Sequence, residues 1–276
     1  MPEKKIHIGK ISYINASPVY YGLEKELLPS WLKMVPDVPA VLNKKIMTGD
    51  LKISPISAAF YAMNHQDLMI LPDLSISCYG EVMSVLLASN YPLNDLSGKR
   101  VLLSQESATA TAFLKMIFIS REIVPMYETG SVGDMDYCAE SADAVLVIGD
   151  VALTNPWYET YQYCFDLGQL WYEMTTLPFV FALWVVRKDF AMQLPEKVRE
   201  IHRLLLNSKE QGHQNMDEII RSGSQRLDLS YGIIKAYFEL LHCDLDARKI
   251  KAMAQFFDSL FKQGVLSEKP GINFFK

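Results

Sequence analysis

The sequence lacks the short motifs that mark several large enzyme classes. None of the patterns H-E-x-x-H, G-x-S-x-G, G-x-x-x-x-G-K-[ST] or G-x-G-x-x-G occurs in its 276 residues. These patterns would supply a zinc-binding histidine pair, an activated serine, a phosphate-binding loop or a dinucleotide-binding turn, respectively. The sequence therefore gives no support for a zinc hydrolase, a serine hydrolase, a P-loop enzyme or a Rossmann dehydrogenase.

Cysteine is scarce, and its spacing shows neither a C-x-x-C pair nor a histidine at metal-ligand distance. Scattered single cysteines are typical of small buried side chains in a reducing compartment. We therefore expect neither a disulfide nor a metal site at the four cysteines, which are Cys78, Cys138, Cys164 and Cys243.

Long hydrophobic runs are also missing. The longest, residues 177–186, is far shorter than the ~18 apolar residues that a membrane-spanning helix needs. Residues 1–5 lead directly into the first expected strand, without a secretory hydrophobic region. We expect a soluble, cytoplasmic protein that has no membrane partner.

Positive charge is not in excess, since 27 Lys and Arg stand against 32 Asp and Glu, for a net charge of -5. Binding to nucleic acid requires a basic face that neutralises phosphates, so we expect no nucleic-acid partner. An anionic ligand would have to be held by local hydrogen-bond donors.

The most informative stretch that is present lies at residues 12–18, directly after an apolar segment at residues 6–11 that predicts a buried strand. Pro18 suits the first position of a helix, and Ser17 before it is a good N-cap. A strand end that leads into a helix N-terminus, lined by uncharged hydrogen-bonding side chains, is a common place for an anionic ligand in α/β folds.

The same arrangement recurs along the chain. Polar loops follow the expected strands at residues 51–57, 100–104 and 143–148, and one serine interrupts the apolar segment at residues 80–89. Each loop alone is also explained as a helix cap. Strand ends of an open α/β lobe face one crevice, however, so five polar side chains are expected to converge on one ligand: Asn15, Ser57, Ser84, Ser107 and Thr109.

The length of the chain favours two lobes, because single cores stop growing at about 250 to 300 residues. Residues 90–98 are rich in turn-forming residues and predict a crossing into the second lobe, and the apolar strand at residues 177–187 predicts the return. We expect lobe I to comprise residues 1–90 and 180–276, and lobe II residues 91–179. From residue 195 the pattern is helical, so the prediction is an α/β fold with a ligand cleft between its lobes and a helical C-terminal tail.

The sequence Tyr-Ile-Asn-Ala-Ser-Pro at residues 13–18 resembles the signature of the chorismate dehydratase family of the futalosine route to menaquinone. Ala16 stands where that family commonly has Thr, and Lys52 where a Leu-Asp pair is usual. The resemblance implies a periplasmic-binding-protein type 2 fold. It continues in order through residues 39–43, 54–57, 80–85, 107–109, 148–153, 166–171 and 177–184.

The resemblance further implies that chorismate loses water to give 3-[(1-carboxyvinyl)oxy]benzoate, without a cofactor or a metal. Asn15 and Ser84 are then the expected catalytic residues. The proton acceptor stays open between the substrate's own enolpyruvyl carboxylate and Asp150, a carboxylate that could equally cap the turn after its strand. The expected substrate-binding residues are Ser12, Tyr13, Ser57, Ser107, Ala108, Thr109, Gly149 and Asp150.

Other interpretations remain. The sister enzyme that makes 1,4-dihydroxy-6-naphthoate shares the fold, but it opens with a Ser-Pro-Cys-Pro-Asn type of loop and uses a histidine, and neither is in place here. A non-catalytic protein that binds a small carboxylate would need the same cleft together with an export signal, and a regulator's effector domain would normally carry a basic DNA-binding motif. The sequence does not distinguish a monomer from a homodimer.

Overall fold

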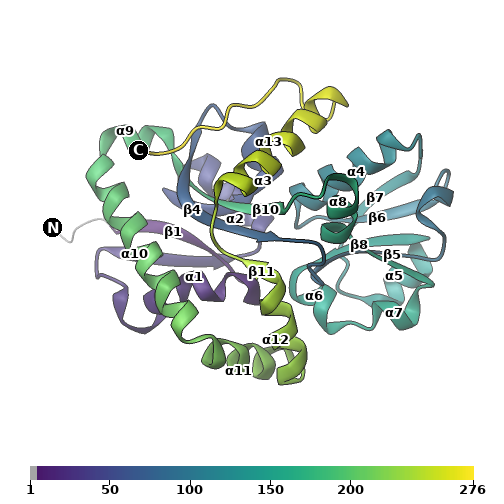
Figure 1. Cartoon of the computed structure of the whole chain (residues 1–276), viewed down its shortest axis with the longest axis horizontal. Helices are drawn as coiled ribbons and strands as arrows, with labels where there is room; N and C mark the ends of the chain where they lie inside the picture. The colour runs from purple at the N-terminus through teal and green to yellow at the C-terminus, as the bar shows by residue number, and fades with distance from the viewer. Residues whose placement is uncertain (1–4) are drawn as a thin grey trace.

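Two separate β-sheets, each flanked by helices, make up the computed structural model, which describes residues 5–276 (Figure 1). The first sheet has six strands in the order β11-β4-β10-β3-β1-β2. These strands are β1 (Ile6–Ile11), β2 (Leu32–Asp37), β3 (Ile53–Ser57), β4 (Leu68–Cys78), β10 (Phe179–Arg187) and β11 (Leu241–His242). The second sheet runs β7-β6-β8-β5-β9, with β5 (Val85–Ser89), β6 (Arg100–Ser104), β7 (Met126–Gly130), β8 (Ala144–Ile148) and β9 (Tyr163–Asp166).

The connections between the sheets differ from the expectation at one place. Strand β5, which we expected in lobe I, pairs with β8 and β9 of the five-stranded sheet. The chain therefore passes between the sheets at residues 79–84, and the turn-rich residues 90–98 lie within the second lobe. The sequence pattern misled because residues 82–88 are apolar apart from Ser84 and, with their neighbours, predict one long strand. Ser84 consequently lies in the connection itself, directly before β5.

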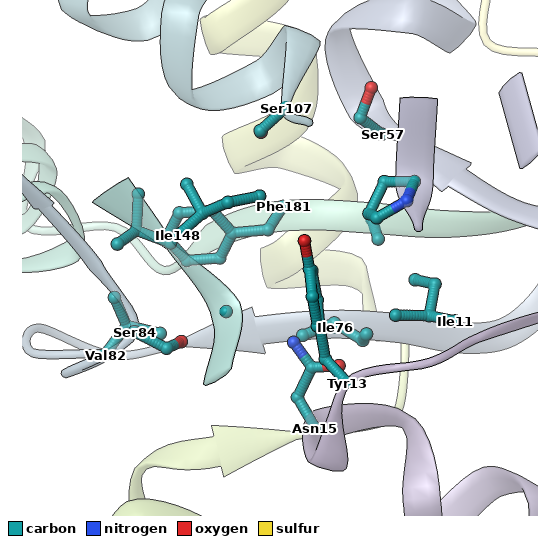
Figure 2. Close-up of a pocket in the computed structure, with 14 residues that line it drawn as sticks. Ile11, Tyr13, Asn15, Ser57, Ile76, Val82, Ser84, Ser107, Ile148 and Phe181 are labelled. Carbon is teal, nitrogen blue, oxygen red and sulfur yellow. The ribbon is translucent and has the colours of Figure 1, made fainter. Parts of the chain in front are cut away.

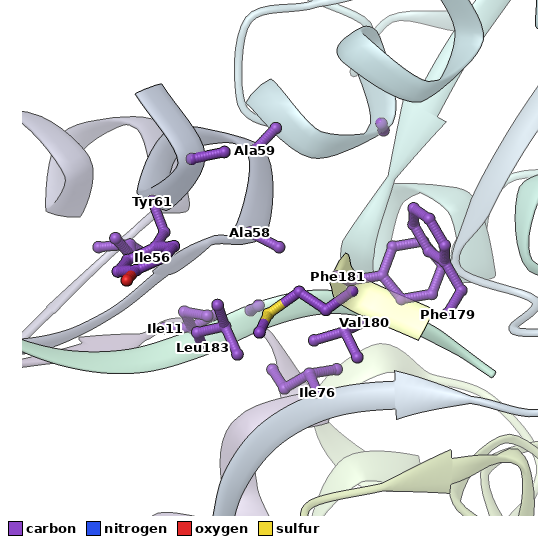
Figure 3. Packing of buried hydrophobic residues seen from close by; sticks show 14 of the residues in the cluster. Ile11, Ile56, Ala58, Ala59, Tyr61, Ile76, Phe179, Val180, Phe181 and Leu183 are labelled. Atoms are coloured by element: carbon purple, nitrogen blue, oxygen red, sulfur yellow. The ribbon is translucent and has the colours of Figure 1, made fainter. Parts of the chain in front are cut away.

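Strand β10 returns the chain to the six-stranded sheet and forms its centre, where it pairs antiparallel with both β3 and β4. Eight of its nine residues are buried, as expected for a strand that is covered on both faces. Figure 3 shows side chains of β10, among them Val180 and Leu183, packed with Ile11 of β1 and Ile76 of β4. This apolar packing supports the strand ends from which the polar loops start.

Helices cover both sheets and form the C-terminal tail, which confirms the expected α/β class. They are α1 (Ser17–Gly22), α2 (Pro39–Thr48), α3 (Ala58–Met63), α4 (Ala108–Ser120), α5 (Met135–Ser141), α6 (Gly149–Thr154), α7 (Trp157–Thr160), α8 (Leu167–Thr175), α9 (Lys188–Gln193), α10 (Pro195–Gln214), α11 (Met216–Leu227), α12 (Tyr231–Leu240) and α13 (Ala247–Lys262). Three short helical turns, η1 (Ile14–Ala16), η2 (Leu23–Leu27) and η3 (Leu93–Asp95), complete the set. Across residues 5–276, no helix combines the length and the apolar character needed to span a membrane.

The tail helices reach the loop after β1. Ile14 of that loop packs in one buried cluster with Ile234, Tyr237 and Phe238 of α12. Met83 of the inter-sheet connection and Leu153 of α6 pack against the same cluster. Four parts of the chain that are far apart in sequence are thus held together beside the cleft.

Candidate active site

A cavity lies between the two sheets and receives residues from both of them (Figure 2). It contains about 510 Å³ of space between atoms, including its opening to solvent. The lining residues are Ile11, Tyr13, Asn15, Pro39, Ser57, Ile76, Val82, Ser84, Val85, Ser107, Ile148, Gly149, Phe181 and Ala182. Apolar walls with a few convergent polar groups are typical of small-molecule sites.

Four of the five side chains expected to converge do so: Asn15, Ser57, Ser84 and Ser107 line the cavity. The described residues of the lining include no Lys, Arg, His, Asp or Glu. An anionic ligand at this place would therefore be bound by hydroxyl, amide and backbone N–H donors. Within residues 5–276 we also find no group of three or more side chains arranged to hold a metal ion.

Asn15 lies in the η1 turn after β1, and its Oδ1 is buried without a hydrogen-bond partner in the described structure. A buried polar atom without a partner typically costs about 1–3 kcal/mol. Figure 2 shows this side chain directed into the cavity, below the ring of Tyr13. An acceptor kept unpaired at such a cost is available to a ligand's O–H or N–H group.

Ser84 is held from behind by the tail. Its Oγ accepts a hydrogen bond of 3.0 Å from the hydroxyl of Tyr237 on α12. Its backbone carbonyl accepts a hydrogen bond of 2.8 Å from the N–H of Gly149, at the start of α6. The serine is therefore fixed through both its main chain and its side chain.

Tyr13 spans the cleft. Its hydroxyl donates a hydrogen bond to the carboxylate of Glu106, which lies in the loop between β6 and α4. Burial, together with the neighbouring Glu106, raises the pKa of Tyr13, so the phenol stays protonated and able to donate. Sequence reasoning missed Glu106, although a carboxylate at a strand end was a signal that could have found it.

Gly149 allows the close approach of Tyr13. Its φ is +65°, and a Cβ added there would lie 2.7 Å from the Tyr13 ring. Any other residue at this position would need a left-handed backbone conformation, and its Cβ would displace the Tyr13 ring. This explains why a glycine follows β8, and it supports the expectation that Gly149 belongs to the site.

Two serines from different lobes line the cavity. Ser107 is the N-cap of α4, and its Oγ accepts from the N–H of Ala110 at 3.1 Å. Ser57 ends β3, and its Oγ accepts from Nδ2 of Asn43 at 3.4 Å. Because both oxygens act as acceptors in these contacts, their own O–H groups are free to donate to a ligand. The N-terminus of α4 adds a favourable dipole for an anion.

Three other predicted binding residues lie outside the lining. Thr109 is fully buried, and its hydroxyl donates to the carbonyl of Phe181 and accepts from the N–H of Ala59, both at 3.0 Å. It thus joins α3, α4 and β10. Ala108 lines a more open neighbouring groove. Ser12 uses its backbone carbonyl to accept a hydrogen bond from the guanidinium of Arg226.

Asp150 also lies outside the lining, where it joins the two lobes. One carboxylate oxygen accepts from the N–H of Ile14 at 3.0 Å, and the other from Arg226 at 2.8 Å. Burial raises the pKa of Asp150, against the smaller opposite effects of the Ile14 N–H and of Arg226. Both oxygens are therefore engaged in a contact between lobes, an arrangement that does not favour Asp150 as the proton acceptor.

Comparison with solved structures identifies the architecture. A protein of Archaeoglobus fulgidus is similar with a TM-score of 0.74 at 19% identity, covering 96% of this chain and all of that one. The alkanesulfonate-binding protein SsuA of Xanthomonas axonopodis, solved with MOPS, is similar with a TM-score of 0.66 at 14% identity, covering 96% of this chain and 95% of that one. These likenesses confirm the expected periplasmic-binding-protein-like fold.

Sequence comparison identifies the family. A chorismate dehydratase of Thermus thermophilus is 29% identical over 245 residues, which cover 83% of this chain and 86% of that protein. A chorismate dehydratase of Campylobacter jejuni is 29% identical over 195 residues, with coverages of 68% and 72%. The model of a family described as "Menaquinone biosynthesis" matches residues 6–262. Because that match spans nearly the whole chain and includes every residue of the cavity lining, the chain belongs to the menaquinone biosynthesis family.

Proposed function

We propose that this protein is a chorismate dehydratase, a hydro-lyase that converts chorismate into 3-[(1-carboxyvinyl)oxy]benzoate and water. The observation that carries the proposal is the unpaired Asn15 amide oxygen in a cavity whose polar lining is otherwise hydroxyl and N–H groups. The relatives named as chorismate dehydratases support the choice of substrate. A ring that carries one carboxylate directly and a second on its enolpyruvyl ether suits apolar walls that carry separate groups of donors.

The chemistry needs one proton acceptor and fixed donors. The hydrogen on C3 of chorismate is acidified through the adjacent double bond by the ring carboxylate. The C3 hydrogen and the C4 hydroxyl share one face of the ring, so a concerted anti elimination is geometrically excluded. In a stepwise route the C3–H electron pair first moves into the ring carboxylate. It then returns to form the C3–C4 double bond as hydroxide leaves C4 and combines with the abstracted proton to give water.

The lining residues divide naturally between these tasks. Ser107 and the N-terminus of α4 would bind the ring carboxylate, where charge develops in the carbanion. A fixed donor at such a place contributes about 3 kcal/mol to transition-state stabilisation. Asn15 and Ser84 would hold the leaving hydroxyl or the enolpyruvyl group.

The proton acceptor in this proposal is the substrate's own enolpyruvyl carboxylate. No Asp, Glu, His or Lys belongs to the lining formed by the described residues, and both oxygens of Asp150 are already engaged. A carboxylate on the substrate can act as the base when the site holds it next to C3, because orientation alone supplies a large part of such rate enhancements.

The test is to incubate purified protein with chorismate, with a chelator present, and to separate the products by chromatography. Formation of 3-[(1-carboxyvinyl)oxy]benzoate at a rate proportional to enzyme supports the proposal. An Asn15→Ala variant serves as the control for contaminating activity. Binding of chorismate without turnover would instead indicate a protein that binds small carboxylates. If neither occurs, the substrate of the dihydroxynaphthoate-forming sister enzyme is the next compound to assay.

A further inference from the structure

Tyr237 lies directly behind the polar wall of the cavity, although it comes from the C-terminal tail. Its hydroxyl is 3.0 Å from Ser84 Oγ. It is 1% exposed and does not belong to the lining, so it cannot touch a ligand in this cavity. Its ring packs with Ile14, the neighbour of Asn15, and with Ile234 and Phe238 of α12.

The direction of this hydrogen bond follows from acidity and burial. A phenol is a stronger acid than an alkyl hydroxyl, so Tyr237 donates and Ser84 accepts. Burial raises the pKa of Tyr237, which keeps its proton in place at neutral pH. The phenol therefore donates to the polar wall of the cavity from behind, through Ser84.

The consequence concerns the hydrogen of Ser84. Within residues 5–276, Ser84 Oγ donates to no protein acceptor, and its acceptor side is occupied by Tyr237. The Ser84 O–H is therefore free to donate into the cavity, which Asn15 also lines. Without Tyr237 the serine hydroxyl would no longer be fixed in this direction and could rotate.

We propose that Tyr237 is a positioning residue for the elimination, holding the Ser84 hydroxyl in the orientation that meets the substrate. This inference rests on the proposed function and deepens it. Asn15 and Ser84 lie on different segments, one after β1 and the other between the sheets. Tyr237 links these segments from a third, in the same buried cluster against which Met83 packs. The tail helix thus completes a site that the first 187 residues do not complete alone.

The test is the variant Tyr237→Phe, which removes one oxygen and keeps the ring. The expected result is a decrease in kcat of about 10- to 100-fold, as is common when reacting groups lose their alignment, with KM changed by no more than about twofold. An interaction that is felt mainly in the transition state lowers kcat and kcat/KM together. An unchanged kcat in this variant, with active wild-type protein beside it, would overturn the inference and leave the proposed function standing.

Tyr61→Phe is the matched control. The hydroxyl of Tyr61 is also buried and donates to the carbonyl of Gly271 at 3.0 Å, but Tyr61 does not line the cavity. We expect Tyr61→Phe to lower the melting temperature as Tyr237→Phe does while leaving kcat near that of the wild type. If both variants lose kcat in proportion to stability, Tyr237 has only a structural role.

A double substitution separates positioning from general loosening of the site. If Tyr237 acts through Ser84, adding Tyr237→Phe to Ser84→Ala lowers kcat no further than Ser84→Ala alone does. If the double variant instead loses kcat by the product of the two single-variant factors, the inference is refuted. Should Tyr237→Phe fail to fold, Ser84→Cys tests the same contact, because a thiol is a weak acceptor. A drop of at least tenfold supports positioning, and a smaller one contradicts it.

Discussion

Replacing Asn15 by alanine is expected to stabilise the protein slightly while it destroys activity. The buried Oδ1 without a partner costs about 1–3 kcal/mol, and its removal recovers that energy. The remaining interactions of the amide group, at about 0.5–1.5 kcal/mol for one hydrogen bond, are lost at the same time. The net expectation is a gain of about 1 kcal/mol, or roughly 2 °C in melting temperature for a chain of this size. Turnover should fall by about 10²- to 10³-fold.

Asn43→Ala is the matched comparison for this experiment. Asn43 is also a buried asparagine, but both ends of its amide contact Ser57, at 3.4 Å each. Its removal should lower the free energy of unfolding by about 1–3 kcal/mol, because the hydroxyl and N–H of Ser57 lose their partner. Calorimetric melting of both variants, with and without chorismate, tests the difference. Equal destabilisation by the two substitutions would show that the unpaired amide oxygen of Asn15 does not cost stability, and it would refute the reasoning.

Three further predictions concern the surroundings of the cavity. Gly149→Ala should destabilise by about 1 kcal/mol more than Gly98→Ala, as measured by denaturant unfolding, because both glycines have positive φ but only a Cβ at Gly149 would meet the Tyr13 ring. Equal losses of stability in the two variants would show that the Tyr13 ring moves aside without cost. Thr109→Val should lower stability by about 2 kcal/mol through two unpaired backbone groups, yet leave KM unchanged; a large rise in KM would restore Thr109 to the substrate-binding residues. The raised pKa of Asp150 means that the folded protein holds its proton more tightly than the unfolded chain. The melting temperature of the wild type minus that of Asp150→Asn should therefore fall as pH rises above the ordinary carboxyl pKa of 3.8. Thermal melting of both proteins from pH 4 to 7 tests this, and a difference that increases with pH would contradict it.

Much of the fold could be predicted from the sequence, because the central strands are buried apolar runs with clear boundaries. The predicted strand at residues 100–104 matches β6, and those at residues 143–148 and 177–187 differ from β8 and β10 by one or two residues at their starts. The edge strands β7 and β9 carry no comparable apolar run and were not predicted. All four residues of β7 from Met126 to Thr129 are exposed, so there was no burial pattern to detect.

The polar loops were predictable, but the contacts behind them were not. Asn15, Ser57 and Ser107 lie at or just after strand ends, and a common crevice follows from the parallel arrangement. Ser84 instead lies in the connection directly before β5. Tyr237 is 153 residues from Ser84, and on an amphipathic helix it looks like any other core residue. The Tyr237 hydroxyl reaches Ser84 only because the C-terminal tail packs behind the cavity. A spacing argument cannot reveal a contact of this kind.

The comparison with solute-binding proteins suggests what turns a binding cleft into a catalytic one. A cleft built only for affinity gains most when every buried polar group has a partner in the closed state. Here the lobes are already joined by protein contacts, through Asp150 with Arg226 and through Tyr13 with Glu106. The closed shape therefore does not depend on a ligand to bridge it, and the groups inside can be kept for the reacting molecule. The unpaired oxygen of Asn15 lies in the same cavity as a serine that is fixed from behind. A local cost of this kind is retained when it serves the transition state rather than the stability of the fold.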